Sequence, residues 1–263
     1  MAATSTGAGS IRARVRAEMT DEIKTIARRH LAADGANLSL RAVARDMGMV
    51  SSALYRYFAS RDDLLTELII DGYDAMGEVA EAADAAVKDR ADLAGRWIAV
   101  AVALRHWAVA HPAEYALLYG SPVPGYVAPQ ATVGPATRPV LVLGAILADA
   151  HASGLLASET SPPAPPLPRA LRPEVRRAAG AVAAGLPEQA MARGLIAWTE
   201  LFGAISFDVF DRLKNTIDER SAWFEYQTRC MVEYLGLTDA APRGGQPAHR
   251  GTRTPRGASR PRG

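Results

Sequence analysis

Apolar residues recur at intervals of three to five along most of this chain, which is the spacing of one face of an α-helix. The first series runs from Val15 to Leu31, and Asp34 and Gly35 are typical of a helix end. No segment alternates apolar and polar residues as a half-buried strand does. The pattern predicts an all-α fold, with later helices over 93–110, 112–119, 140–152, 187–213 and 217–237.

Two stretches interrupt the helical pattern. Residues 120–139 are rich in glycine and proline, and five prolines cluster between 162 and 168, so neither stretch is expected to form regular helix. Residues 1–11 and the Arg/Pro/Gly-rich tail 239–263 have little apolar surface to bury and are expected to be disordered. The remainder divides into a small domain over 12–61 and a larger helical domain over 62–238.

The segment 39–58 has the requirements of a helix-turn-helix. Ser39 is a suitable N-cap for a short helix, Ala44 lets a second helix approach closely, and Gly48 supplies the positive φ of a tight turn. A further short helix is expected from about 50 to 58, and a fourth begins at Arg61. The alternative is two packed helices joined by a glycine turn without a role in binding.

The charge is unevenly distributed, although the net charge is only +2. Residues 1–61 hold ten Lys and Arg against five acids, whereas residues 62–238 hold fourteen basic against twenty-two acidic residues. The tail has six arginines against one aspartate. A basic small domain joined to an acidic larger one predicts that the small domain meets a polyanion.

Two runs of residues resemble the tetracycline-repressor (TetR) family. Leu54-Tyr55-Arg56-Tyr57-Phe58, followed by Arg61-Asp62-Asp63-Leu64-Leu65, is similar to the end of that family's recognition helix and the start of its fourth helix. The run from His111 to Tyr126 resembles one class of its C-terminal domain. The resemblance implies a three-helix DNA-binding domain followed by a larger helical ligand-binding and dimerisation domain. It also implies a cytoplasmic homodimer that binds double-stranded operator DNA.

The resemblance also assigns DNA-binding residues position by position. Ser51 and Ser52 match positions that meet base edges, and Arg41 matches one that reads guanine in some members, as a guanidinium fork can. The serine usual before the recognition helix is Val50 here, so capping can pass to Ser51, which would then read no base. Tyr55 can alternatively be a half-buried aromatic without a DNA contact. The remaining residues match family positions that contact the DNA backbone, and they are Ser39, Tyr55, Tyr57 and Arg61.

The larger domain carries an aromatic set that lines either a ligand pocket or a core. We expect a pocket for a small apolar or amphipathic effector. Apolar residues surround nearly the whole of 195–213, more than one core can bury, so this helix and the last one are expected to form the homodimer contact. The aromatic set is Trp97, Trp107, Tyr115, Tyr119, Tyr126, Trp198 and Phe202.

Several other functions find no support in the sequence. It contains no metal-ligand spacing, no nucleophile elbow and no phosphate loop, so we expect no catalysis, no metal and no cofactor. Cys230, the lone cysteine, is expected to be a small buried hydrophobe. No stretch reaches the roughly 18 uninterrupted apolar residues of a membrane span, and residues 1–10 lack the apolar core of a signal peptide.

The sequence therefore predicts a transcriptional regulator, with three functional alternatives. The first is a repressor that a small-molecule effector releases from its operator. The second is a DNA-binding regulator that a protein partner controls. The third is an enzyme that merely contains a helix-turn-helix.

Overall fold

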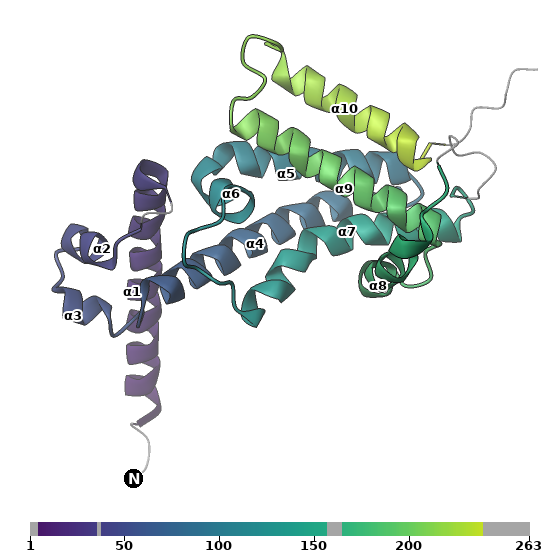
Figure 1. Ribbon diagram of the computed structural model, residues 1–263. Coiled ribbons are helices and arrows are strands. Elements are labelled where there is room, and N and C mark those ends of the chain that lie inside the picture. Colours follow the sequence, from purple (N-terminus) through teal and green to yellow (C-terminus); the bar gives the residue numbers. More distant parts are fainter. Residues whose placement is uncertain (1–4, 36–37, 157–164, 239–263) are drawn as a thin grey trace, which may run out of the picture.

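The computed structural model describes residues 5–35, 38–156 and 165–238, and the regular elements in these ranges are all helical. The expected all-α fold is confirmed. Helices α1 (Ser5–Asp34), α2 (Leu40–Asp46) and α3 (Ser51–Leu54) group at one side, and α4 (Arg61–Ala86) leads from them into a larger bundle (Figure 1). The bundle's other helices are α5 (Leu93–Ala110), α6 (Pro112–Tyr119), α7 (Val133–Ala152), α8 (Arg172–Val182), α9 (Glu188–Val209) and α10 (Arg220–Leu235).

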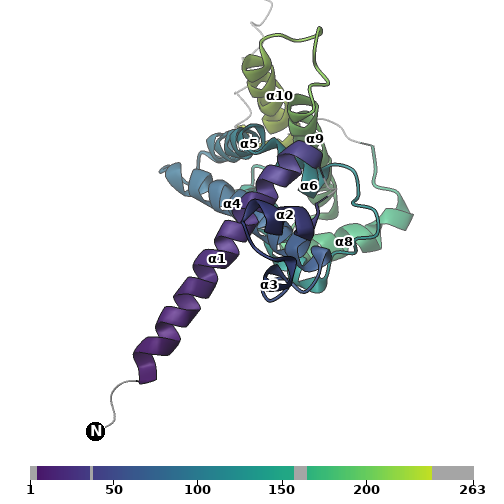
Figure 2. The same cartoon turned by 90° about the vertical axis from the view of Figure 1, so that its left-hand side faces the viewer.

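The small N-terminal domain has its own hydrophobic core. Ile23, Ala27 and Leu31 of α1 pack with buried residues of α2 and α3, and the first turns of α4 close this core with Leu64 and Leu65. Helix α1 begins at Ser5, ahead of the domain start expected at residue 12, and its first half projects away from the other helices (Figure 2). Residues 1–4 and the tail 239–263 lie outside the described residues.

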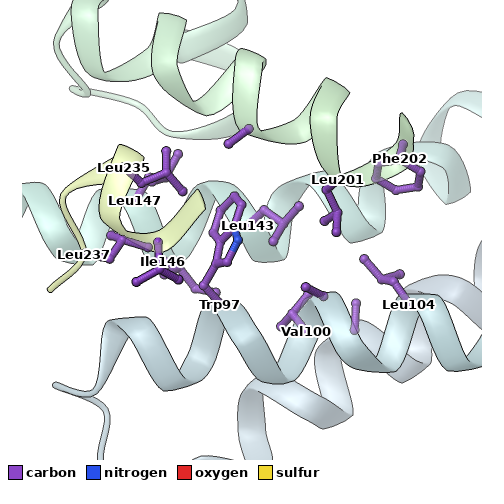
Figure 3. Packing of buried hydrophobic residues seen from close by; sticks show 14 of the residues in the cluster. Trp97, Val100, Leu104, Leu143, Ile146, Leu147, Leu201, Phe202, Leu235 and Leu237 are labelled. Carbon is purple, nitrogen blue, oxygen red and sulfur yellow. The ribbon is translucent and has the colours of Figure 1, made fainter. Parts of the chain in front are cut away.

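The larger domain is built around α5. Its residues Trp97, Val100 and Leu104 point toward side chains from α7 and α9, and the end of α10, with Leu235 and Leu237, lies near Trp97 (Figure 3). Helices α9 and α10 run side by side along one side of the bundle (Figure 1). Helix α7 lies along α4 and α5. Helix α4 contributes buried residues to the cores of both domains.

The expectation that 120–139 lacks regular helix is wrong in its second half. A 3-10 turn, Gln130–Thr132, leads directly into α7 at Val133. Pro135 lies in the first turn of α7, where backbone N–H groups have no partner within the helix. Pro139 removes one further hydrogen bond, but its ring is buried in the bundle, and this packing keeps the helix continuous.

Other helices also differ from expectation: α9 ends at Val209 rather than at 213, and α10 runs from Arg220 to Leu235 rather than over 217–237. Helix α8 was not predicted, although Pro173 at its first turn and the buried pair Val175 and Ala179 have helical spacing. Helix α3 ends at Leu54 rather than near Phe58, and the residues after Leu54 form turns. Of the proline cluster, residues 165–168 form no regular element, and 162–164 lie outside the described residues.

The bundle also encloses one hydroxyl whose removal should be measurable. The Tyr115 hydroxyl donates to the Phe202 carbonyl oxygen at 3.1 Å and lies 2.9 Å from Ser206 Oγ, and burial raises the pKa of Tyr115 from 10.0 to about 12. Because these hydrogen bonds are buried, Tyr115→Phe should lower the free energy of unfolding by about 1 kcal/mol at pH 7 in urea titrations.

The pH dependence of stability gives a second readout of the same variant. A raised pKa favours neutral tyrosine in the folded state, so this stabilisation is complete below pH 10 and is lost as the pH rises toward 12. Tyr115→Phe should therefore make the fall in stability over this range less steep. Tyr55→Phe, which alters an exposed ring, is the control. Equal unfolding curves for wild type and Tyr115→Phe would contradict the prediction.

Candidate nucleic-acid interface and apolar cavity

The turn between α2 and α3 has the geometry of a helix-turn-helix. The Ser39 hydroxyl accepts a hydrogen bond from the Ala42 backbone N–H at 3.4 Å and so caps α2. Gly48 adopts a φ of 66°, and the Met49 N–H returns to the Ala44 carbonyl at 2.9 Å. The N-cap role of Ser39 and the positive φ of Gly48 are both confirmed.

Helix α3 begins without a side-chain cap. Its N-cap is Val50, which is 71% exposed, and Ser51 is the first helical residue. Capping therefore does not pass to Ser51, and this hydroxyl is not engaged as a cap. Ser52 is exposed and Ser51 is half-buried.

The other predicted DNA-binding residues lie on α2, at the end of α3 and at the start of α4. Arg41 is exposed on α2, and Tyr55 is 45% exposed just after α3. Tyr57 lies beneath the Arg16 guanidinium, which is 5.1 Å from the ring centroid. Arg61 is half-buried, and its Nε donates to the Leu38 carbonyl at 3.1 Å. Arg61 therefore also connects the start of α4 to the segment before α2.

The aromatic set of the larger domain separates into different environments. Trp97 and Trp198 line a cavity of about 300 Å³ between α5, α7, α8 and α9. Tyr119 packs between Tyr115 and Phe202, with ring centroids 5.1 and 4.6 Å away, in a filled aromatic cluster.

The last two aromatics lie elsewhere. Trp107 stacks on His111 with ring centroids 5.1 Å apart. The Tyr126 hydroxyl is 2.9 Å from Thr66 Oγ1, and its ring packs against the core of the small domain.

The cavity also has walls that the sequence did not indicate. Most are small or aliphatic side chains from α7 and α8, and α8 itself was not predicted. In the sequence, the helical spacing of Val175, Ala179 and Val182 was the feature that could have predicted α8. The complete lining is Trp97, Ala136, Thr137, Val140, Leu143, Gly144, Leu147, Ala178, Val182, Met191, Gly194, Leu195 and Trp198.

An arginine clamp connects the cavity wall to α4. Arg138 stands between the lining residues Thr137 and Val140 on α7. Its guanidinium binds both carboxylate oxygens of Glu81 at 2.9 and 2.8 Å and the Asp74 carboxylate at 2.7 Å. The hydrogen bond from Arg138 lowers the pKa of Glu81. Gly77 makes room for this side chain, since a Cβ there would lie 2.6 Å from Arg138 Nε.

Helices α9 and α10 leave an apolar surface uncovered in the single chain. Ile196, Phe207 and Tyr226 are each more than half exposed. Cys230 is exposed as well, so the expectation of a buried cysteine is wrong for the single chain. Helix α10 buries Phe224, Thr228 and Val232 against the bundle instead, and Cys230 lies on its outer face.

Comparisons with known proteins place these features in a family. The family model for bacterial regulatory proteins of the tetR family matches residues 25–68, and the model for the tetracyclin repressor-like C-terminal domain matches residues 97–231. The HTH-type transcriptional regulators Rv1816 of Mycobacterium tuberculosis and Mb1846 of Mycobacterium bovis are each 38% identical over 227 residues, which is 84% of this chain and 93% of each relative. The chain belongs to the TetR family of bacterial transcriptional regulators.

Solved structures agree with this membership. The regulatory protein SCO4313 superposes with a TM-score of 0.67 and 31% identity, covering 83% of this chain and 97% of that one. A tetR-family regulatory protein from Rhodococcus RHA1 shares the fold, with a TM-score of 0.55, 15% identity, and coverage of 84% and 98%. A TetR-family regulator binds operator DNA through its helix-turn-helix and acts as a dimer.

Helix α7 has the composition of a membrane span but the position of a core helix. The segment Gln130–Ala152 is long and apolar enough to cross a bilayer by length and composition alone. In the bundle it lies along α4 and α5, and Leu143, Ile146 and Leu147 are buried there (Figure 3).

Alanine substitutions at two glycines, Gly48 in the turn and Gly180 in α8, are expected to change the free energy of unfolding in opposite directions. A Cβ at Gly48 would meet no atom, so Gly48→Ala should cost only the backbone strain of its positive φ, about 1–2 kcal/mol of unfolding free energy. Gly180 in α8 also has open space but a helical backbone, so Gly180→Ala should stabilise by about 0.5–1 kcal/mol. Both are measured by urea unfolding. A neutral or stabilising Gly48→Ala would mean that the turn does not require glycine.

Proposed function

We propose that this TetR-family regulator is a homodimeric repressor that leaves its operator when a small apolar or amphipathic molecule fills the cavity between α5, α7, α8 and α9. The cavity carries the proposal, because a volume of about 300 Å³ with apolar walls is within the range of ligand pockets. A filled domain would instead favour control by a protein partner. An enzymatic role finds no support in the described residues, among which no group of three metal-ligating side chains occurs.

We infer that α2 and α3 meet the operator. Exposed Arg41 and Ser52, together with the excess of basic residues over 1–61, support this assignment. In the proposed complex, Arg41 reads guanine, whereas Tyr55, Tyr57 and Arg61 contact the backbone. Two such domains related by a dimer axis require half-sites about one helical turn apart, or a multiple of it.

Arg41→Ala tests base reading. It should reduce the preference for operator over random DNA by about 1–3 kcal/mol per base pair read, since a bidentate contact to guanine is lost. Arg45→Ala removes the same charge from the same helix, where Arg45 is largely exposed, and is the matched control. Arg45→Ala should weaken binding to operator and to random DNA by similar factors in fluorescence anisotropy titrations. If Arg41→Ala weakened binding to operator and to random DNA equally, Arg41 would not read a base.

The proposed dimer contact is the uncovered apolar surface of α9 and α10. Leu201 and Phe202, which belong to the apolar series over 195–213, are only 6% exposed and pack inside the chain. Ile196, Phe207 and Tyr226 remain to be covered, and a four-helix contact across a two-fold axis would bury them.

Phe207→Arg tests this contact. Because a buried, unpaired charge opposes association, the variant should sediment as a monomer at concentrations where the wild type is a dimer. Val127→Arg is the matched control, since Val127 is 86% exposed on the loop between α6 and α7. A dimeric Phe207→Arg would show that the contact lies elsewhere.

The proposed route from cavity to DNA passes through Arg138. A ligand that displaces the N-terminal half of α7 changes the position of Arg138, and Arg138 holds α4 at Asp74 and Glu81. Since α4 also closes the core of the small domain, its displacement changes the placement of α2 and α3.

Arg138→Gln tests the route. A binder from an apolar fragment screen, detected by tryptophan emission, should weaken operator binding of the wild type by about 5- to 150-fold. Arg138→Gln should keep the binding of that compound but lose most of its effect on DNA. Arg176→Gln, which breaks an ion pair between α8 and α9 only, is the control. Binding that leaves the operator affinity of the wild type unchanged would show that the site is not regulatory.

A further inference from the structure

The N-terminal half of α1 is left uncovered by the rest of the described chain. Residues 11–17 are all exposed, and they precede residue 25, where the match to the family model begins. Ile11 and Val15 are each about half exposed, although they continue the apolar series that α1 buries from Ile23 onward. This part of α1 therefore lies outside the core of the small domain and has a surface that a partner can contact.

The charges on this segment are all positive. Residues 11–17 contain three arginines and no acid. Farther along α1 the cations are neutralised within the chain, since Lys24 and Arg28 both bind Asp71 of α4. Arg12, by contrast, forms no ion pair with any residue that the structure describes. The exposed segment thus presents unneutralised positive charge, which favours a polyanionic partner.

Arg16 holds this segment against the end of the helix-turn-helix. Its guanidinium lies over the Tyr57 ring, and its Nη2 donates to the Arg56 carbonyl oxygen at 2.9 Å. Arg12 precedes Arg16 by one helical turn, so it lies on the same face of α1 and about 6 Å farther along the helix axis. Arg14 is on the opposite face, where it pairs with Glu18 at 3.5 Å.

The direction of α1 determines which part of the DNA this segment meets. Helices α9 and α10, the proposed dimer contact, lie at the top of both views, whereas the N-terminal half of α1 points to the bottom (Figure 1 and Figure 2). A second subunit on α9 and α10 is therefore on the side opposite to Arg12. In such a dimer, Arg12 points away from the two-fold axis and toward the duplex outside the half-site.

We propose that the N-terminal half of α1 binds the phosphate backbone of the duplex outside each half-site, with Arg12 as the outermost contact. This inference rests on the proposed function, because it uses the operator complex and the dimer through α9 and α10. Charge complementarity and continuity identify the partner: the segment is wholly cationic, and Arg16 joins it to Tyr57, which is assigned to the DNA backbone. Phosphate contacts carry no base information, so the sequence of the flanking duplex should not matter.

The test compares two duplexes that carry the same operator, recovered by selection of bound genomic fragments. The shorter duplex ends at the outer edges of the half-sites, and the longer one has about six further base pairs at each end, roughly 20 Å at 3.4 Å per base pair. Binding of the full-length protein is measured by fluorescence anisotropy between about 50 and 200 mM salt. For the wild type, the plot of log K against log salt concentration should be steeper by about 2 on the longer duplex, because each of two subunits displaces counterions from one further phosphate.

Arginine variants identify the contact. Arg12→Ala should have equal slopes on the two duplexes, so on the longer duplex the rise in salt should weaken the wild type about tenfold more than Arg12→Ala. Arg14→Ala removes the same charge from the opposite face of α1 and is the matched control, which should keep the wild-type difference. Both side chains are exposed, so neither substitution should affect folding.

Each other outcome overturns a defined part of the inference. Equal wild-type slopes on the two duplexes would show that α1 does not reach the flanking duplex, and would leave operator binding by the helix-turn-helix intact. An equal effect of Arg12→Ala and Arg14→Ala would show attraction by net charge without the proposed contact. A gain that depends on the sequence of the added base pairs would show base reading instead of backbone binding. A wild type that selects no DNA would overturn the proposed function as well.

Discussion

Helix α4 contributes buried side chains to two separate hydrophobic cores. Leu64, Leu65 and Leu68 close the core beneath α1 to α3, and farther along Met76 and Ala80 are fully buried in the bundle. With 26 residues it extends over about 39 Å. Because its two ends cannot move independently without breaking the helix, the position of the DNA-binding domain depends on how the bundle holds α4.

Two arginines hold α4 against α7. Arg96, on α5 and 2% exposed, binds Asp84 of α4 and Asp149 of α7 at 2.7 Å each. Arg138 of α7 binds Asp74 and Glu81 of α4 on a more exposed face. The same helix α7 forms a long wall of the apolar cavity. The cavity wall and the helix that carries the DNA-binding domain are thus joined by charge-assisted hydrogen bonds, which are directional and set the relative position of the helices.

The parts of this fold that sequence reasoning predicted are those with local causes. The cap at Ser39, the turn at Gly48 and the bounds of α5 and α6 follow from residues within one or two turns. The helical start of α7 was missed because Pro139 opposes helix locally, and only its burial in the bundle compensates. Cavity lining was predictable only for Trp97 and Trp198, since aromatic residues at helical spacing do not reveal which rings pack together. The rings of Tyr115, Tyr119 and Phe202 pack against one another instead of lining the cavity.

The central claim is that filling the cavity changes the separation of the two DNA-binding domains. It is tested by electron–electron dipolar spectroscopy on the dimer, with a spin label at the exposed position of Ala59→Cys in a Cys230→Ser background. Without ligand, the domains must fit successive major grooves, about 34 Å apart from centre to centre. A saturating concentration of the cavity binder from the apolar fragment screen should shift the distance between the labels by several ångströms, and Arg138→Gln should abolish the shift. An unchanged distance in the wild type, with binding of that compound confirmed by calorimetry, would contradict the account.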